Sequence, residues 1–413
     1  MRYYDQCKEI YAAYGIDTEA AIQRLENIPV SVHCWQGDDV IGFDGSDALS
    51  GGIQTTGNYP GRARTPEELF ADVERAFSLM PGKKRINVHA SYALLGEEKG
   101  TVDRDAYAYR HFAPWVELAK RVGAVGVDFN PTFFAHPMMK DGLSLSSPDE
   151  PTRRFWVRHG RACLAIAAEM GKAMNSPCLV NIWIPDGCKD IPADRLSPRL
   201  RLMKSLDEML DGYDKEWVIP AVESKVFGIG LESYTVGNNE FYQNYAATRG
   251  ICCTLDTGHY HPTEVVSDKI PSLLAFHDKV ALHVSRPVRW DSDHVVILDD
   301  ELKEIAKEIV RGGAEDRVII GLDYFDASIN RLLAWVTGVR SMQKALLWAL
   351  LLPHGELAKL QDESNFTKIM YLNEKFKSMP WGGVWEEYLR RQGLSNDWYG
   401  DIEKFEDEVI AKR

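Results

Sequence analysis

Four acidic or histidine side chains stand at the ends of four successive apolar runs in the second half of the chain. They are Glu223, Asp256, His283 and Asp323. Taken singly, an acid at the end of a strand is often only a helix N-cap, and one histidine is often a satisfied core residue. Three carboxylates cannot gather in a dry pocket unless a positive charge compensates them. Oxygen ligands with one imidazole suit Mn, Mg, Co or Zn, so the set predicts a divalent-metal site.

A second set of metal-binding side chains lies just beyond these ends. His259 follows Asp256 by three residues, and the segment Asp291–His294 contains two aspartates two residues apart. In an extended segment such residues point the same way, so we expect Asp291 and Asp293 to chelate one ion together with His259. Glu223 can bridge this ion and the first one, an arrangement related to two-metal sites. The alternative for the Asp-x-Asp pair is an ordinary turn.

Side chains suited to binding a small polar molecule lie near the same strand ends. Lys225 stands two residues after Glu223 and can donate to a substrate oxygen, although a solvated surface lysine is the alternative. Four aromatic residues are candidate walls for a sugar, and core packing explains any one of them equally well. They are Trp35, Phe129, Trp183 and Phe325.

Eight short apolar runs alternate with longer amphipathic stretches. The runs are 28–34, 85–89, 124–129, 178–184, 218–222, 251–255, 280–284 and 318–322. They are rich in Val and Ile and hardly alternate, as expected of parallel strands buried on both faces. The order predicts an α/β fold, a (β/α)8 TIM barrel, in which all the residues named above lie at the C-terminal mouth. An open doubly wound sheet is the structural alternative.

Helix starts and the domain division follow from local signals. Thr65 with Pro66 and Glu68 predicts an N-cap, and Ser197 and Ser328 are similar candidates. The long segment 36–64 is expected to form a loop over the barrel mouth. We predict a catalytic barrel domain over 1–327, including an N-terminal helix, and a C-terminal helical extension over 328–413 that makes barrel-packing and oligomer contacts.

Composition excludes several functional classes. The 413 residues carry 61 acids and 48 bases, a net charge of -13 that argues against a nucleic-acid partner. The start of the chain has no apolar region, so we expect no secretory signal. The most apolar stretch, 332–352, is interrupted by Arg340 and Lys344 and is expected to be a buried helix without membrane contact. Seven cysteines without a CxxC pair favour reduced thiols in a cytoplasmic protein.

Over nearly its whole length the chain resembles the L-rhamnose isomerase family. The segments that carry the resemblance are Val32–Asp39, Asp128–Thr132, Ile182–Gly187, Glu223–Lys225, Leu255–His259 and Ser285–His294. The resemblance implies a metal-dependent aldose–ketose isomerase on a xylose-isomerase-like barrel, usually a homotetramer and usually activated by Mn2+. It implies the interconversion of L-rhamnose and L-rhamnulose by a metal-assisted hydride shift between C2 and C1, the first step of L-rhamnose catabolism.

The resemblance also implies roles for individual residues. The first set, Glu223, Asp256, His283 and Asp323, would hold a structural ion. His259, Asp291 and Asp293, with Glu223 shared, would hold a catalytic ion. Mn2+ is expected, with Zn2+, Co2+ or Mg2+ possible at one position. Lys225 matches a lysine near the substrate oxygens, and His89 and Asp323 are candidates for assisting ring opening.

Three alternatives stay open at this point. The chain can be another deoxy-sugar or rare-sugar isomerase or epimerase on the same fold, because a fold does not determine a substrate. A non-catalytic sugar-binding protein would need a secretory signal and would have little use for so many metal ligands. A metal-dependent hydrolase or endonuclease of similar architecture is disfavoured for nucleic acid by the negative charge.

Overall fold

Eight parallel strands close into a barrel in the part of the chain that the structure describes. The structure is a computed structural model, and it describes residues 2–45, 55–225, 233–289 and 291–413. The barrel strands are β1 (Val30–His33), β2 (Lys84–His89), β3 (Val127–Asn130), β4 (Cys178–Ile182), β6 (Val218–Glu223), β8 (Cys252–Asp256), β9 (Val280–Val284) and β10 (Val318–Leu322). Each lies within, or within one residue of, a predicted apolar run, so the barrel prediction is confirmed.

Closure of the sheet rests on the two partners of β1. Val30 pairs with Lys84 of β2 on one side and with Ile320 of β10 on the other. The order around the barrel is β1-β10-β9-β8-β6-β4-β3-β2. The alternative of an open doubly wound sheet is therefore excluded. Because all eight strands are parallel, their carboxyl ends meet at one mouth.

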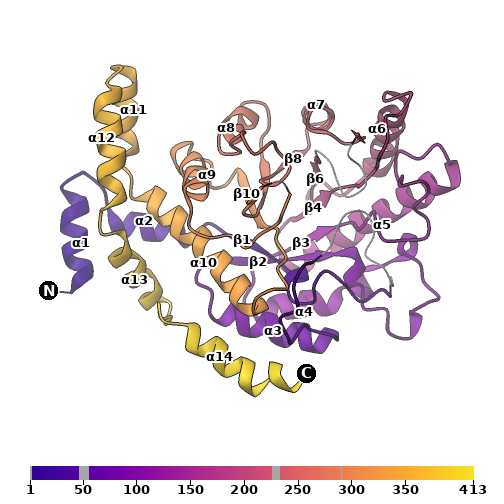
Figure 1. The fold of residues 1–413 in the computed structure, drawn as a ribbon, viewed down its shortest axis with the longest axis horizontal. Coiled ribbons are helices and arrows are strands. Elements are labelled where there is room, and N and C mark those ends of the chain that lie inside the picture. The colour runs from indigo at the N-terminus through magenta and orange to yellow at the C-terminus, as the bar shows by residue number, and fades with distance from the viewer. Residues whose placement is uncertain (1, 46–54, 226–232, 290) are drawn as a thin grey trace.

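Helices surround the barrel and extend beyond it (Figure 1). Those of the barrel layer are α3 (Pro66–Ser78), α4 (Ala113–Arg121), α5 (Glu150–Met174), α6 (Ser197–Leu210), α7 (Asn239–Arg249), α8 (Lys269–Leu274), α9 (Asp300–Arg311) and α10 (Arg331–Leu350). The others are α1 (Tyr3–Ala12), α2 (Thr18–Leu25), α11 (His354–Asp362), α12 (Phe366–Lys377), α13 (Trp381–Arg391) and α14 (Tyr399–Glu408). In Figure 1, α11 and α12 project away from the barrel.

Short elements complete the description. Gly187–Cys188 (β5) and Tyr234–Thr235 (β7) form a two-stranded antiparallel sheet. The 3-10 helices are Cys34–Gln36, Ala90–Tyr92, Gly96–Glu98, Arg104–Ala106, Tyr109–His111 and Ile410–Lys412.

Three predicted helix starts can be compared with the structure. Thr65 caps α3 as predicted, because its hydroxyl accepts a hydrogen bond from the Glu68 N–H at 3.3 Å. Helix α6 begins at Ser197, but the first N–H groups are bound by the Asp194 carboxylate. Helix α10 is capped by Asn330, two residues after the predicted Ser328. At α10 an amide oxygen thus supplies the cap in place of serine. At α6 the N-cap position is Leu196, whose side chain makes no capping hydrogen bond, so the predicted serine cap is wrong there as well.

The apolar segment 332–352 forms the last helix of the barrel layer. Helix α10 packs against α9, α2 and α3 and touches β1, and most of its residues are buried. We therefore propose that the boundary between the barrel and the extension lies after α10 and not at residue 327. The extension then consists of α11 to α14, with α13 packed against α1.

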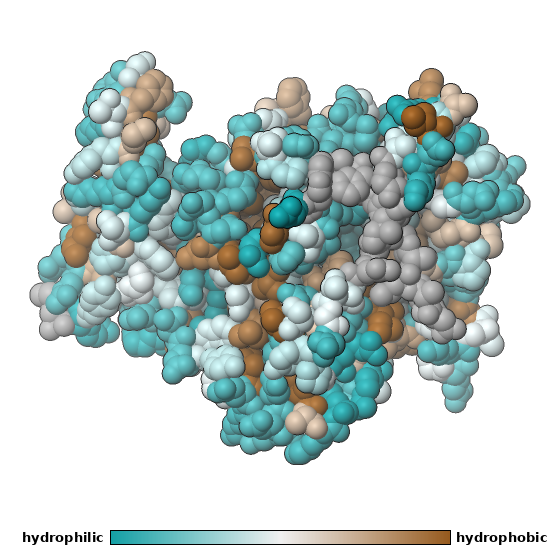
Figure 2. Space-filling view, viewed as in Figure 1, coloured by the Kyte–Doolittle hydropathy of each residue, from teal (hydrophilic) through white to brown (hydrophobic). Residues whose placement is uncertain are grey.

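The surface seen in Figure 2 is largely hydrophilic, with apolar side chains scattered over it. Within the described ranges, no helix has both the length and the apolar character needed to cross a membrane. All seven cysteines are free, and six of them are buried.

Candidate metal centre

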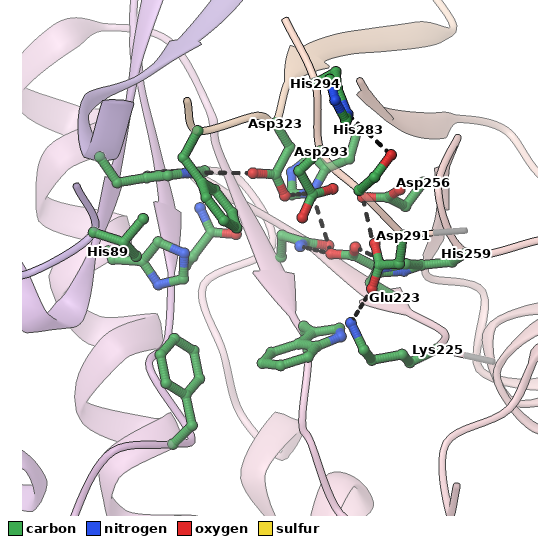
Figure 3. Close-up of a pocket in the computed structure, with 18 of the residues that line it drawn as sticks. His89, Glu223, Lys225, Asp256, His259, His283, Asp291, Asp293, His294 and Asp323 are labelled. Carbon is green, nitrogen blue, oxygen red and sulfur yellow. Dashed lines mark hydrogen bonds and ion pairs between the residues drawn. The ribbon is translucent and has the colours of Figure 1, made fainter. Parts of the chain in front are cut away.

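A cavity of about 340 Å3 opens at the C-terminal mouth of the barrel. The side chains that line it are Trp35, Val40, Thr56, His89, Asn130, Phe134, Asn181, Trp183, Glu223, Lys225, Asp256, His259, His283, Asp291, Ser292, Asp293, His294, Asp323 and Phe325. Figure 3 shows carboxylates and imidazoles converging in it, with His89 across the cavity from His259 and Lys225. All of the predicted metal-binding residues thus meet in one place.

The first predicted set forms one compact group of donors. Glu223, Asp256, His283 and Asp323 each offer an atom, and these atoms all lie within 4.8 Å of one another. His283 Nδ1 is 3.2 Å from Glu223 Oε2 and 3.1 Å from Asp323 Oδ2. The group arises because β6, β8, β9 and β10 are neighbours in the barrel and each carries its polar residue at the same end.

A second group consists of Asp256, His259 and Asp291, again with donor atoms within 4.8 Å of one another. His259 Nε2 is 3.3 Å from Asp291 Oδ1, and His259 Nδ1 is 3.3 Å from Glu223 Oε1. Asp256 therefore belongs to both groups. Glu223 faces both histidines, with Oε1 toward His259 and Oε2 toward His283.

Asp293 lines the cavity but does not belong to that second group. The prediction paired it with Asp291 on the assumption of an extended segment. Asp293 instead has a φ of 41°, in the left-handed region, so its side chain does not repeat the direction of Asp291. Burial raises the pKa of the Asp293 carboxyl well above its ordinary value, and the facing carboxylates of Asp291 and Asp256 raise it further.

Gly258 allows the carboxylates of the second group to approach. Its N–H donates to Asp256 Oδ1 at 2.6 Å. A Cβ at this position would lie 2.9 Å from Asp291 Oδ1 and 3.2 Å from Asp256 Oδ1. Both carboxylate oxygens thus fill the space that a side chain would need.

The pKa values in this centre are shifted because several acids lie close together in a buried space. Burial raises the pKa of Asp256 to about 8, with the other carboxylates adding to the rise and His259 opposing it. Burial by itself would lower the pKa of His259, but Asp256 and Asp291 outweigh it and raise the pKa to about 10. Burial would raise the pKa of Asp323, yet His283 holds it at about 2. Without a further positive charge, the histidines must carry protons to balance the acids.

The donors fit a cation better than they fit one another. His259 Nδ1, both ring nitrogens of His283, and Asp291 Oδ1 are buried and have no hydrogen-bond partner among the described residues. Carboxylate oxygens lie 3.1–3.3 Å from some of these atoms, but not in hydrogen-bonding geometry. Buried polar atoms of this kind need a partner. The set of oxygen and imidazole donors suits a hard or borderline divalent ion.

Lys225 contributes a buried positive charge to the second group. Its Nζ forms an ion pair with Asp291 Oδ2 and lies 5.1 Å from the centre of the Trp183 ring. Burial would lower the pKa of this ammonium, but the surrounding carboxylates, Asp291 first, raise it above its ordinary value. Lys225 therefore stays charged inside the cavity.

Three of the four predicted aromatic walls line the cavity. They are Trp35, Trp183 and Phe325. The Trp35 indole N–H donates to Asp323 Oδ1 at 3.0 Å. The predicted wall role of Phe129 is wrong. Its ring packs edge-on against Phe112 with ring centres 5.0 Å apart, and Asn130 faces the cavity in its place. Successive side chains of a strand point to opposite faces, so Phe129 faces the helical layer.

His89 also lines the cavity, between aromatic rings. It lies edge-on to Trp35 at 4.6 Å and to Phe134 at 5.9 Å between ring centres. Burial lowers the pKa of His89 to about 4, against the opposing effect of Asp323. The imidazole is therefore neutral near pH 7.

Several lining residues were not among the predicted site residues. Asn130 ends β3 and Asn181 is the last residue but one of β4, so the strand-end pattern does point to both, but it assigns neither of them a role. Val40, Thr56 and Phe134 lie in loops and carry no motif, whereas Ser292 and His294 lie in the segment Asp291–His294, which was singled out only for its two aspartates.

The loop predicted over the mouth does reach the cavity through its described parts. Val40 and Thr56 line the cavity, and the Tyr59 N–H donates to the Ala327 carbonyl at 2.8 Å. Residues 46–54 of this loop, and Trp290 of the segment 285–294, lie outside the described residues.

Known proteins are similar to this chain over nearly its whole length. A family model described as L-rhamnose isomerase (RhaA) matches residues 1–413. The L-rhamnose isomerase of Mannheimia succiniciproducens is 52% identical over 414 residues, which cover 99% of this chain and 98% of that protein. The L-rhamnose isomerase of Pectobacterium carotovorum subsp. carotovorum is 53% identical over 410 residues, with 98% and 97% covered.

Some solved structures are also similar to this chain, at low sequence identity. An L-ribulose 3-epimerase is 12% identical with a TM-score of 0.48, covering 76% of this chain and 95% of that one. A xylose isomerase-like TIM barrel protein from Mycobacterium smegmatis in complex with magnesium is 12% identical with a TM-score of 0.47, covering 79% of this chain and 99% of that one.

Proposed function

The chain belongs to the L-rhamnose isomerase family, and from this premise we propose that it interconverts L-rhamnose and L-rhamnulose with the help of divalent cations. One structural observation supports the proposal in addition to the family match. Two donor groups share Asp256, and Glu223 faces the histidine of each, inside a cavity of about 340 Å3. A cavity of this size suits a small sugar.

Two cation positions are proposed. Glu223, Asp256, His283 and Asp323 would hold one ion, and His259 and Asp291 would hold the other. Glu223 is proposed as a shared ligand because its Oε1 faces His259 and its Oε2 faces His283, while Asp256 lies within reach of both groups. Asp293 is proposed to complete the second position, since it lines the same cavity, although its raised pKa means that a cation would have to displace its proton. Mn2+ is the proposed ion, and Zn2+, Co2+ or Mg2+ can replace it at one position, because the donors are oxygens and imidazoles.

A bound divalent cation would act as a Lewis acid, polarising the substrate carbonyl and making the neighbouring hydroxyl easier to deprotonate. The side chains of the cavity are proposed to supply the other contacts to the substrate. Lys225 keeps its charge beside the second group and is proposed to donate to a substrate oxygen as negative charge develops there. Trp35, Trp183 and Phe325 would form the walls against which the sugar packs.

The proposed hydrogen transfer is a hydride shift from C2 to C1, in which the hydrogen moves with its electron pair while a proton moves from O2 to O1. An enediol route would need a free base at C2. Glu223, Asp256, Asp291 and Asp323 all belong to the two donor groups, which supports the direct shift.

Ring opening is proposed to involve His89 and Asp323. His89 is neutral and lies across the cavity from the second group (Figure 3). A neutral imidazole can donate one hydrogen bond to a ring oxygen. Asp323 is held by the Trp35 indole and by His283, so its carboxylate has a defined direction.

The cellular setting is proposed from the family and from surface features. We propose a cytoplasmic homotetramer that acts in the first step of L-rhamnose catabolism, without a nucleic-acid or membrane partner. Seven free cysteines are compatible with a reducing compartment. Phe366, Met370 and Tyr371, all on α12, are 59–71% exposed and would be covered by subunit contacts.

The test is an assay of the purified protein on L-rhamnose before and after removal of metal with EDTA. We expect L-rhamnulose to form, activity to disappear with the metal, and added Mn2+ to restore it. A panel of other deoxy-aldoses and ketoses run in parallel identifies the preferred sugar. Undiminished turnover after complete metal removal, or no turnover of L-rhamnose with Mn2+ present, would overturn the proposal.

A further inference from the structure

Below the donor groups, three side chains from adjacent strands form a hydrogen-bonded chain that ends on Glu223. The Thr254 hydroxyl of β8 donates to Asn181 Oδ1 of β4 at 2.7 Å. The Asn181 Nδ2 group donates to Glu223 Oε2 at the end of β6. All three side chains are buried, with Thr254 fully inaccessible.

The barrel geometry brings the three residues together. Strand β6 lies between β4 and β8, and Glu223 pairs in register with Thr254 while Asn181 pairs with Ala221. Thr254 precedes Asp256 by two residues, so both side chains point into the barrel, with Thr254 one layer deeper. Asn181 lines the cavity, and Thr254 lies beneath it, outside the cavity wall.

The direction of the hydrogen bonds in this chain is determined at both ends. A carboxylate that holds cations is ionised and can only accept, so Asn181 must turn its NH2 group toward Glu223. The Asn181 carbonyl then faces Thr254, whose hydroxyl must be the donor. An exchange of the Asn181 amide oxygen and nitrogen would place an oxygen against the carboxylate.

Glu223 has to present its two oxygens to different places. Oε1 faces His259 in the second group, and Oε2 faces His283 in the first. We infer that Thr254, acting through Asn181, is a positioning residue that fixes the carboxylate plane of Glu223 so that it can serve both cation positions. The inference rests on the proposed metal-dependent function, and it adds two residues that support the metal ligands from below.

Outer residues of this kind orient ligands, and their loss typically weakens metal binding by about 10- to 100-fold. Thr254→Val keeps the shape of the side chain but removes the donor. We expect calorimetric titration of the metal-free protein with Mn2+ to show binding weakened by about tenfold or more. Thr254→Ser keeps the hydroxyl and should bind Mn2+ as the wild type does.

Thr18→Val is the matched control. Thr18 is also fully buried, and its hydroxyl shares a hydrogen bond with Tyr4 at 2.9 Å, but it lies on α2, outside the barrel. We expect this variant to lose some thermal stability and to keep its affinity for Mn2+. A loss of affinity in both variants would mean that any buried threonine matters, and would overturn the inference.

A double-mutant cycle tests whether Thr254 acts through Asn181. We expect Asn181→Ala to weaken Mn2+ binding, and Thr254→Val to weaken it no further in the Asn181→Ala background. Because Asn181 borders the open cavity, its alanine variant tests the chain of hydrogen bonds even if Thr254→Val folds poorly. Additive losses, or a Thr254→Val protein that binds Mn2+ like the wild type, would overturn the inference.

The wild-type titration separates this inference from the proposed function. A wild-type protein that binds no divalent cation contradicts both. A wild-type protein that binds Mn2+ and isomerises L-rhamnose, with Thr254→Val and Asn181→Ala unchanged in affinity, contradicts only the role assigned to Thr254 and Asn181.

Discussion

The Thr132 hydroxyl lies between the Ser91 N–H and Nδ1 of His89. The Thr132 hydroxyl oxygen accepts a hydrogen bond from the Ser91 N–H at 3.0 Å and lies 3.2 Å from His89 Nδ1. Because this hydroxyl already accepts from Ser91, we expect it to donate its own proton to Nδ1. The neutral imidazole then carries its own proton on Nε2.

Thr132→Val should therefore allow the proton of the neutral His89 imidazole to occupy either ring nitrogen. We expect the 15N chemical shifts of this imidazole to change from the Nε2–H form toward a mixture, with kcat/KM on L-rhamnose falling about tenfold, which equals about 1.4 kcal/mol. Thr132→Ser keeps the donor and should resemble the wild type. Unchanged 15N shifts in Thr132→Val would contradict the assignment.

Lys225→Met should impair turnover more than metal binding. The variant loses the ammonium that pairs with Asp291 in the cavity, and removal of such a group typically costs about 10²- to 10³-fold in kcat. Steady-state kinetics together with Mn2+ titration separates the two effects. Lys344→Met is the control, because Lys344 lies 5.4 Å from the Trp385 ring centre just as Lys225 lies over Trp183, but away from the cavity. Equal losses in both variants would point to a general packing effect.

Asp291→Asn should remove turnover and leave the fold intact. Asp291 belongs only to the second donor group, so we expect metal analysis to find the first position still filled and the second empty. The metal-free variant should unfold at a lower temperature than the metal-free wild type, because Lys225 and His259 lose the carboxylate that pairs with their buried positive charges. Asp300→Asn, on the exposed start of α9, should change nothing. Full activity in Asp291→Asn would refute the ligand assignment.

Gly258→Ala should weaken metal binding through crowding. The new Cβ would lie 2.9 Å from Asp291 Oδ1, closer than such contacts normally are, so Asp291 must move. We expect Mn2+ affinity to fall by about tenfold, in the range typical of displaced ligand geometry. Gly355→Ala on α11 meets nothing within 4 Å and should stabilise the protein by about 0.5–1 kcal/mol without affecting Mn2+. Normal affinity in Gly258→Ala would show that Asp291 is not held in place by this contact.

Asp38→Asn should change how stability depends on pH. Burial raises the pKa of Asp38 from 3.8 to about 7 in the folded protein, with hydrogen bonds from Tyr92 and Gly42 opposing the rise. The folded state therefore binds more protons than the unfolded state between about pH 4 and 7, and stability falls as pH rises through this window. The loss attributable to Asp38 is at most about 4 kcal/mol.

Urea unfolding of both proteins from pH 5 to pH 8 measures this effect. The amide introduced by Asp38→Asn can accept from the Gly42 N–H and donate to the Tyr92 oxygen, so the variant should keep both contacts. It should lose the contribution of Asp38 to the pH dependence of the free energy of unfolding. Since all other titrating groups are common to both proteins, the difference between the two curves isolates Asp38. A difference that stays constant with pH would contradict the raised pKa.

Much of the fold and the location of the centre could be predicted from the chain. Eight apolar runs predicted eight buried strands, and the parallel barrel then required Glu223, Asp256, His283 and Asp323 to share one mouth. This inference needs only the period of the pattern and the direction of the strands. Where the barrel domain ends stays a prediction, because an apolar helix has the same sequence pattern whether it closes a barrel or extends it.

The sequence by itself determined that acids and histidines from distant segments meet where the strands end, because hydrophobic burial decides strand position and parallel strands end together. Only the tertiary structure decided which way each side chain points. Phe129 faces the helices and Asn130 the cavity, Asp293 lines the cavity from a left-handed backbone outside the second donor group, and Thr254 reaches Asn181 across two strand spacings. Side-chain direction depends on register, φ and neighbouring atoms, and these exist only once the chain has closed on itself.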